Sequence, residues 1–240
     1  MTFWRTLKAT YRDSIALFVA CPLLALIPVA FEIAQHAVEV RIGMYDSVAM
    51  AQAVEHHPLR MGFGVLKVAS LLLAGYWVPR FLAWRDPRRA GRLDPPAVRL
   101  FAGFFAFQLA IALVQLFVLP QTGAVLLVTF LGGQIVNVLV VAWGIAAPLG
   151  NAVIGPRRSV AIMAPQLLWG VAFSLAAMLP LMIPHYAFAA LALLGPRWAL
   201  WPVMLIDSLL VGWLTAVLVA AAYHVALRGA ERAGVTLTPA

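Results

Sequence analysis

The chain has 240 residues, of which 64% are hydrophobic and only 11% are charged, and its net charge at pH 7 is +8. Residues 100–156 contain no Asp, Glu, Lys or Arg. Helices of a soluble domain need a polar face, so this composition excludes a soluble globular domain. It predicts an all-α, polytopic membrane protein. A membrane β-barrel is excluded as well, because the sequence has no series of short alternating strands.

The excess of basic residues does not indicate a nucleic-acid partner. These residues lie at the ends of apolar runs, where membrane topology and anionic lipid headgroups account for them. The sequence has no aromatic-interleaved basic motif, so we expect the chain to bind no nucleic acid. The single cysteine, Cys21, excludes an intrachain disulfide. It lies in the first apolar run, which is expected to be a retained transmembrane helix and not a cleaved signal peptide.

The apolar runs predict six membrane spans within one domain, residues 1–240, because about 20 apolar residues cross the hydrocarbon layer. In chain order the spans cover about residues 14–34, 62–83, 98–119, 124–149, 160–183 and 200–227. They form three consecutive helical hairpins, which makes the fold a polytopic membrane helical bundle.

The links between the spans differ in character. The first link, residues 35–61, is the longest and most polar, and Pro58 separates a helical piece from the second span. The third and fourth spans are joined by the tight turn "PQTG". The link "PHYAFAALALLGPRW" after the fifth span is predicted to hold a short helix at the membrane interface, where Trp198 and Trp201 suit the headgroup level.

The charge distribution sets the orientation of the predicted bundle. The N-terminal segment, the links after the second and fourth spans, and the C-terminal tail carry 13 of the 17 Lys and Arg residues. Cytoplasmic loops carry the excess of these residues. Both termini are therefore predicted to face the cytoplasm, with the chain in the lipid bilayer of a bacterial inner membrane.

The three hairpins, the basic cytoplasmic links and the last helix ending in "AYHVALRG" resemble six-helix bacterial membrane families. Those families include the Yip1-like and the glycerophosphodiesterase-associated membrane domains. The resemblance concerns the hydropathy layout of most of the chain, and it implies an inner-membrane multi-pass protein without assigning any catalytic residue. The long polar segment "FEIAQHAVEVRIGMYDS" departs from those layouts.

Two oppositely charged residues lie inside predicted spans, where ionisable side chains are costly and mark candidate functional sites. Lys67 lies about five residues into the second span, and Asp207 lies about seven residues into the sixth, counted from the same side. Both therefore sit roughly 8 to 10 Å below the membrane surface. This predicts an intramembrane ion pair, either a structural pair or a gate or proton-coupling pair. His224, beside Tyr223, is predicted to anchor the sixth span at the interface.

A set of amide side chains follows the middle of the predicted bundle. Gln108 and Gln115 are seven residues apart and share one face of the third span. Gln134 and Asn137, three residues apart, share a face of the fourth span. Gln166 lies on the fifth. Interhelical hydrogen bonds, at about 0.6 kcal/mol each, explain such residues. The alternative is a polar pathway or a substrate site.

The outer side of the predicted bundle holds a cluster of carboxylates and imidazoles. If the first helix continues past Ala34, one of its faces carries a polar stripe of Glu32, Gln35, His36 and Glu39. The full candidate cluster consists of Glu32, His36, Glu39, His56, His57 and His185.

Three interpretations of this cluster remain open. Carboxylates and imidazoles bind zinc and iron, so a divalent metal could lie between Glu32 and His36, although no known metal motif is present. The stripe could instead face water at the interface and pair with Arg41 or Arg60. The third interpretation is a proton or ligand site.

Three classes of function follow from these features. No serine lies in an activating motif and no Gly-rich phosphate loop precedes a lysine, so an enzyme is the less favoured class. A non-catalytic accessory or scaffold subunit, which binds another membrane protein or a second copy of itself, ranks first. A small transporter or lipid-handling protein with an outer-side polar entrance ranks second, and a metal-dependent enzyme at the outer face ranks third. A polar cavity that reaches Gln108, Gln134 or Asn137 would favour the second class.

Overall fold

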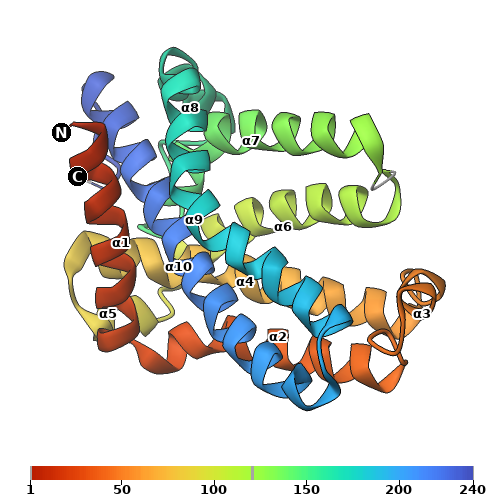
Figure 1. Ribbon diagram of the computed structural model, residues 1–240. Helices are drawn as coiled ribbons and strands as arrows, with labels where there is room; N and C mark the ends of the chain where they lie inside the picture. The colour runs from red at the N-terminus through yellow and green to blue at the C-terminus, as the bar shows by residue number, and fades with distance from the viewer. Residues whose placement is uncertain (1, 120–121, 240) are drawn as a thin grey trace.

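The computed structural model describes residues 2–119 and 122–239, and within these ranges it contains helices and no strand. Six helical segments are long and apolar enough to cross a membrane, which confirms the predicted all-α bundle. Figure 1 shows their arrangement. They are α2 (Pro22–Arg41), α4 (Pro58–Trp84), α6 (Pro95–Phe117), α7 (Gly123–Ala146), α9 (Leu167–Leu194), preceded by α8 (Pro156–Met163) and η1 (Ala164–Gln166), and α10 (Leu200–Arg232), preceded by η2 (Arg197–Ala199).

The first span differs from the predicted range 14–34. The chain forms a separate helix, α1 (Phe3–Ala20), and leaves the helical conformation at Cys21, where φ is −132° and ψ is 54°. Pro22 causes this break, because proline lacks a backbone N–H and disfavours the helical conformation of the residue before it. α1 then lies crosswise to α4, α6 and α7 at the end of the bundle that holds both termini (Figure 1). The candidate span is Pro22–Arg41.

The links contain two short helices. α3 (Val48–Ala53) begins after Ser47, whose Oγ accepts a hydrogen bond from the Met50 amide at 3.1 Å. α3 confirms the predicted helical piece before the second span, and Pro58 then begins α4. α5 (Pro87–Gly91) follows α4. The predicted turn "PQTG" includes Pro120 and Gln121, which lie outside the described residues.

The fifth span is longer than predicted. α9 continues through Pro180 and Pro184 to Leu194, so the interfacial helix expected from residue 184 onward is the end of α9 itself. Proline inside a helix removes one backbone hydrogen bond, and neighbouring helices in a membrane can compensate for this loss. The apolar run therefore continues as one helix until Gly195, whose amide donates to the Leu191 carbonyl at 2.8 Å.

α10 is the central helix of the bundle. It packs against α1, α2, α4, α7 and α9, and 61% of its apolar window is buried, compared with 6% for α6 and 11% for α7. Figure 1 shows α10 running diagonally across the molecule while the α6–α7 hairpin extends away from it. The hairpin is thus the part of the bundle that the rest of the chain covers least.

Glycine allows the close contact between α10 and α2. A Cβ added at Gly212 would overlap the side chain of Val29 and lie 3.6 Å from the Ala25 carbonyl oxygen. Gly132 on α7 has open space at the same position, with nothing within 4 Å of an added Cβ. Small residues generally permit such close approach of membrane helices.

These two glycines provide a matched test of the α2–α10 contact. Gly212→Ala is expected to reduce stability by about 1–3 kcal/mol, because overpacking forces the helices apart. Gly132→Ala introduces the same methyl group into open space and is expected not to reduce stability. Thermal unfolding of the detergent-solubilised protein measures both effects. Equal melting temperatures for the two variants would contradict the close packing.

Candidate functional site

The polar stripe of α2 is buried against other helices. α2 continues to Arg41, as the predicted stripe requires, and its exposed fractions are 1% for Glu32, 9% for Gln35, 8% for His36 and 3% for Glu39. The stripe faces α4 and α10, which both pack against α2. The stripe does not face water, so that prediction is wrong. Its predicted pairing with Arg60 is present, since Arg60 Nε lies 3.2 Å from Glu39 Oε1.

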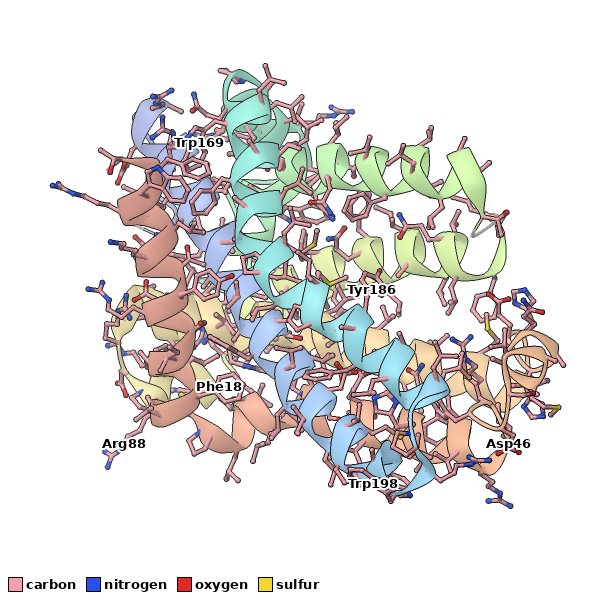
Figure 2. The ribbon with its side chains drawn as sticks, viewed as in Figure 1. Phe18, Asp46, Arg88, Trp169, Tyr186 and Trp198 are labelled. Carbon is pink, nitrogen blue, oxygen red and sulfur yellow. The ribbon has the colours of Figure 1, made fainter. Side chains whose placement is uncertain are left out.

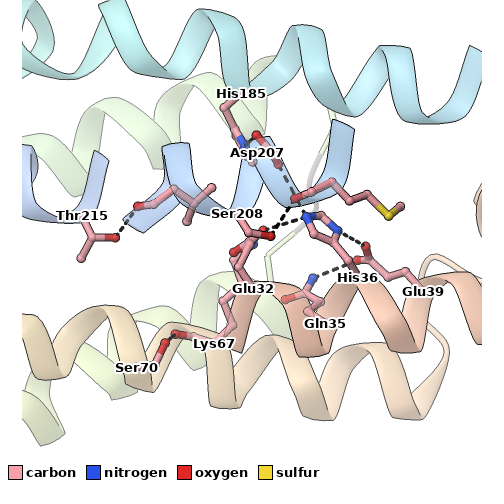
Figure 3. Close-up of polar contacts among 12 residues, drawn as sticks. Glu32, Gln35, His36, Glu39, Lys67, Ser70, His185, Asp207, Ser208 and Thr215 are labelled. Atoms are coloured by element: carbon pink, nitrogen blue, oxygen red, sulfur yellow. Dashed lines mark hydrogen bonds and ion pairs between the residues drawn. The ribbon is translucent and has the colours of Figure 1, made fainter. Parts of the chain in front are cut away.

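Glu32, His36 and Asp207 form the centre of this site, and Figure 3 shows their side chains pointing toward one another between α2 and α10. His36 Nε2 lies 3.5 Å from Glu32 Oε1 and 3.6 Å from Asp207 Oδ2. His185 from α9 contributes its Nδ1, at 2.8 Å from Asp207 Oδ1. We refer to Glu32, His36, Glu39, Lys67, His185 and Asp207 together as the carboxylate–histidine cluster.

The predicted Lys67–Asp207 pair is replaced by three other pairs. Lys67 Nζ lies 2.8 Å from Glu32 Oε1, whereas Asp207 pairs with His185 and His36. α2 packs against both α4 and α10. Glu32 of α2 therefore pairs with Lys67 of α4, and His36 of α2 lies beside Asp207 of α10. Lys67 and Asp207 thus belong to one network without pairing directly.

Glu39 forms the outer edge of the cluster and has a complete set of partners. Its carboxylate accepts hydrogen bonds from Gln35 Nε2 at 2.9 Å, Tyr45 OH at 2.7 Å and Arg60 Nε at 3.2 Å. Burial and the charge of Glu39 raise the pKa of the Tyr45 hydroxyl, so Tyr45 remains a donor. Tyr45 was not among the residues predicted for this site.

Two predicted members of the cluster lie elsewhere. His57 caps α4, where its Nδ1 accepts a hydrogen bond from the Leu59 amide at 3.2 Å. His56 is exposed and lines a hollow beside the α6–α7 hairpin. The link that carries both histidines folds outward from the end of α2, so Asp207 takes the place that sequence reasoning gave to them.

A cavity of about 260 Å³ lies between α4, α6, α7, α9 and α10, and we call it the amide-lined cavity. Its wall is mostly apolar, and its polar members include Gln108, Gln134 and Asn137. Gln108 Nε2 donates to Asn137 Oδ1 at 3.0 Å, as expected for an interhelical hydrogen bond. Gln108 Oε1 is buried and has no hydrogen-bond partner within the described part of the chain, so it is free to accept one from an occupant.

Four of the five predicted pathway amides meet in this region. Gln115 lines a second hollow of about 600 Å³ between α6 and α7, which shares Gln108 and Asn137 with the amide-lined cavity. Gln166 is the exception: its Oε1 accepts a hydrogen bond from Arg232 Nη1 at 2.9 Å, at the last turn of α10. Gln166 lies in η1, directly before α9, so it is a helix-end contact and not part of the central set.

A second charged cluster lies where α1 crosses the bundle. Asp13 is only 2% exposed, and its carboxylate lies 3.0 Å from His224 Nε2 and 2.8 Å from Arg85 Nη2. Burial alone would raise the pKa of the Asp13 carboxyl, but the hydrogen bonds with His224 and Arg85 outweigh burial and lower it below 3.8. No sequence pattern indicates this cluster, since Asp13 and His224 are 211 residues apart.

Comparison with known proteins finds no match, whether with a family model, with a curated protein or with a solved structure. The geometry of these sites therefore carries the functional interpretation.

Double substitutions can identify the partner of Lys67. Lys67→Met is expected to reduce stability by about 3–5 kcal/mol, because it leaves the buried Glu32 carboxylate without its cation. Adding Glu32→Gln to Lys67→Met is expected to recover most of the lost stability, whereas adding Asp207→Asn is not. Melting temperatures of the two double variants in detergent distinguish these outcomes. Recovery with Asp207→Asn alone would instead support a direct Lys67–Asp207 pair.

The Asp13 cluster is expected to make stability depend on pH. A carboxyl group whose pKa is lowered by folding stabilises the folded state above its unfolded pKa, near 3.8, and this contribution is lost as the pH falls through the folded pKa. Asp13→Asn is therefore expected to cost about 3 kcal/mol at pH 7 and progressively less below pH 3.8. Glu231→Gln, at an exposed residue, serves as the control. Thermal unfolding is measured at pH 7 and at a pH below 3.8. A loss that is equal at both pH values would contradict this origin.

Proposed function

We propose that this chain is a multi-pass protein of a bacterial inner membrane that binds a lipid or a similarly amphipathic molecule within its transmembrane helices. The amide-lined cavity carries this proposal. Sites for small ligands are mostly apolar, with a few polar groups that fix the orientation of the ligand. The amide-lined cavity has this character, and Gln108 Oε1 offers an acceptor without a partner among the residues that are described.

The hollows beside the α6–α7 hairpin extend the cavity toward one end of the bundle. The hollow between α6 and α7 shares Leu72, Gln108 and Asn137 with the cavity. At its other end it shares Leu119 with a third hollow, which His56 and Pro58 line. Neighbouring, mostly apolar hollows of this kind suit an acyl chain, with the amides placed to meet the polar part of the molecule.

The orientation in this proposal follows the distribution of basic residues. Figure 2 shows Arg88, in the link between α4 and α6, on the opposite side of the molecule from Asp46, in the link between α2 and α3. The side of Arg88 also holds both termini (Figure 1) and most of the Lys and Arg residues. The positive-inside rule assigns that side to the cytoplasm. The hollow beside His56 then opens toward the outer face.

A scaffold or accessory subunit is the second candidate, and the exposure of the α6–α7 hairpin favours it. Only 6% of the apolar window of α6 is buried, so a helix of a partner protein or of a second copy could cover this hairpin. The amide-lined cavity favours lipid handling over this role, because a packed scaffold has no need of a polar acceptor within an apolar cavity.

Bound lipid tests the proposal directly. The protein is purified in a mild detergent, and co-purifying lipid is measured by native mass spectrometry and by extraction. Ala222→Phe places a ring at the wall of the amide-lined cavity and is expected to remove most of the bound lipid. Ala187→Phe introduces the same ring at an exposed position of α9 and is expected to leave the lipid content unchanged.

Two results would contradict lipid binding in the cavity. One is a wild-type protein that retains no lipid but carries a second protein chain, which would support the scaffold role. The other is equal lipid content in the Ala222→Phe and Ala187→Phe variants, which would place the lipid on the outer surface of the bundle.

A further inference from the structure

The centre of the carboxylate–histidine cluster has the donor atoms of a metal site. Glu32, His36 and Asp207 each offer one ligand atom, and the three atoms lie within 4.8 Å of one another. His36 Nε2 is 3.5 Å from Glu32 Oε1 and 3.6 Å from Asp207 Oδ2. In a tetrahedral zinc site with bonds of about 2.0–2.2 Å, neighbouring ligand atoms stand about 3.3 Å apart. The two separations from His36 Nε2 are close to that value, and the third is within 4.8 Å.

Two buried atoms at this centre point to a ligand. Glu32 Oε2 and His36 Nε2 have no hydrogen-bond partner in residues 2–119 and 122–239, and these two residues are only 1% and 8% exposed. Buried polar atoms are nearly always paired, because an unpaired one costs about 1–3 kcal/mol. A cation placed between the three residues would satisfy both atoms.

Neighbouring side chains hold polar atoms of all three residues, and one of these atoms is Glu32 Oε1, the carboxylate oxygen that lies 3.5 Å from His36 Nε2. Glu39 Oε2 lies 3.3 Å from His36 Nδ1, His185 Nδ1 lies 2.8 Å from Asp207 Oδ1, and Lys67 Nζ lies 2.8 Å from Glu32 Oε1. Metal-binding histidines usually donate their second N–H to a carboxylate, which fixes the tautomer and turns the other nitrogen toward the metal. The contact between His36 and Glu39 has this arrangement.

The charged groups of the cluster, counted together with Arg60, carry a net negative charge when both histidines are neutral. Glu32, Glu39 and Asp207 supply three negative charges, whereas Lys67 and Arg60 supply two positive ones. With both histidines neutral, the buried group is left one positive charge short. A proton on His36 is the ordinary way to supply it, and a metal ion at the centre is the other. A protonated Nε2 would lie 3.5 Å from Glu32 Oε1 and 3.6 Å from Asp207 Oδ2, which is longer than a hydrogen bond to either carboxylate. This favours the metal, because an ion between the three groups can bind all of them at once.

We propose that Glu32, His36 and Asp207 bind a divalent first-row transition metal ion, of the zinc or ferrous class. One imidazole and two carboxylates suit these ions. The site joins α2 to α10, so metal binding fastens these helices to each other. The three ligands leave a further coordination position for water or another small ligand. Lys67 and His185 border the site with side chains that are 20% and 21% exposed.

Zinc binding to the full-length protein tests this site. The detergent-solubilised protein is treated with EDTA, freed of chelator and titrated with Zn²⁺ by isothermal titration calorimetry, with metal analysis of the product. The wild type is expected to bind one zinc ion per chain. His36→Gln and Asp207→Asn are expected to weaken binding more than Glu39→Gln, which is expected to weaken it about 10–100-fold. His56→Gln, at an exposed histidine, is the control and is expected to bind zinc as the wild type does.

The outcomes that would overturn the proposal are specific. No zinc binding by the wild type would leave a protonated His36 as the cation of the cluster. Loss of binding in His56→Gln but not in His36→Gln would place the zinc on the exposed link. If the His36 and Asp207 variants fail to fold, X-ray absorption of the zinc-loaded wild type decides. One imidazole with oxygen ligands supports the site, whereas two or more imidazoles, or oxygen ligands alone, overturn it.

Discussion

The pairing of three buried carboxylates is the constraint on which the arrangement of the membrane helices depends. An isolated charge buried among helices costs several kcal/mol, and breaking a buried pair costs about 3–5 kcal/mol. Each carboxylate therefore has a partner from another helix: Glu32 with Lys67, Glu39 with Arg60, and Asp207 with His185. These pairs, together with His36 beside Asp207, join α2, α4, α9 and α10. The rotation and depth of the four helices relative to one another are fixed by these contacts.

The interruption of the helix at Cys21 makes a second charged cluster possible at the other end of α10. Because Pro22 ends α1 at Ala20, α1 is free to cross the end of the bundle and to bring Asp13 to His224 and Arg85. Tyr11 adds a hydrogen bond of 2.8 Å to the Ala177 carbonyl of α9. α10 thus carries a buried acid–base group near each end, and the apolar residues between them form its contacts with the other helices.

The α6–α7 hairpin is held in place by weaker interactions than the rest of the bundle. It has no ion pair to hold it in position between residues 100 and 146, because that stretch of the sequence contains no charged residue. The Gln108–Asn137 hydrogen bond joins its two helices, and such bonds in membranes contribute only about 0.6 kcal/mol. Weak attachment and low burial are typical of the parts of a protein that open most easily. The hollows along this hairpin therefore lie where a ligand can enter at little cost in packing.

The sequence by itself determined the membrane class, the number of spans and the single stripe of Glu32, Gln35, His36 and Glu39, because hydropathy and the helical period are local properties. Only the tertiary structure decided that this stripe faces inward, that Lys67 meets Glu32, that Asp207 replaces His56 and His57 in the cluster, and that Gln166 belongs to a helix end. The physical reason is that both the lipid-facing and the protein-facing sides of a membrane helix are apolar. The pattern of such a sequence therefore locates each helix along the chain but does not reveal its rotation or its neighbours, and these two properties determine which polar groups meet.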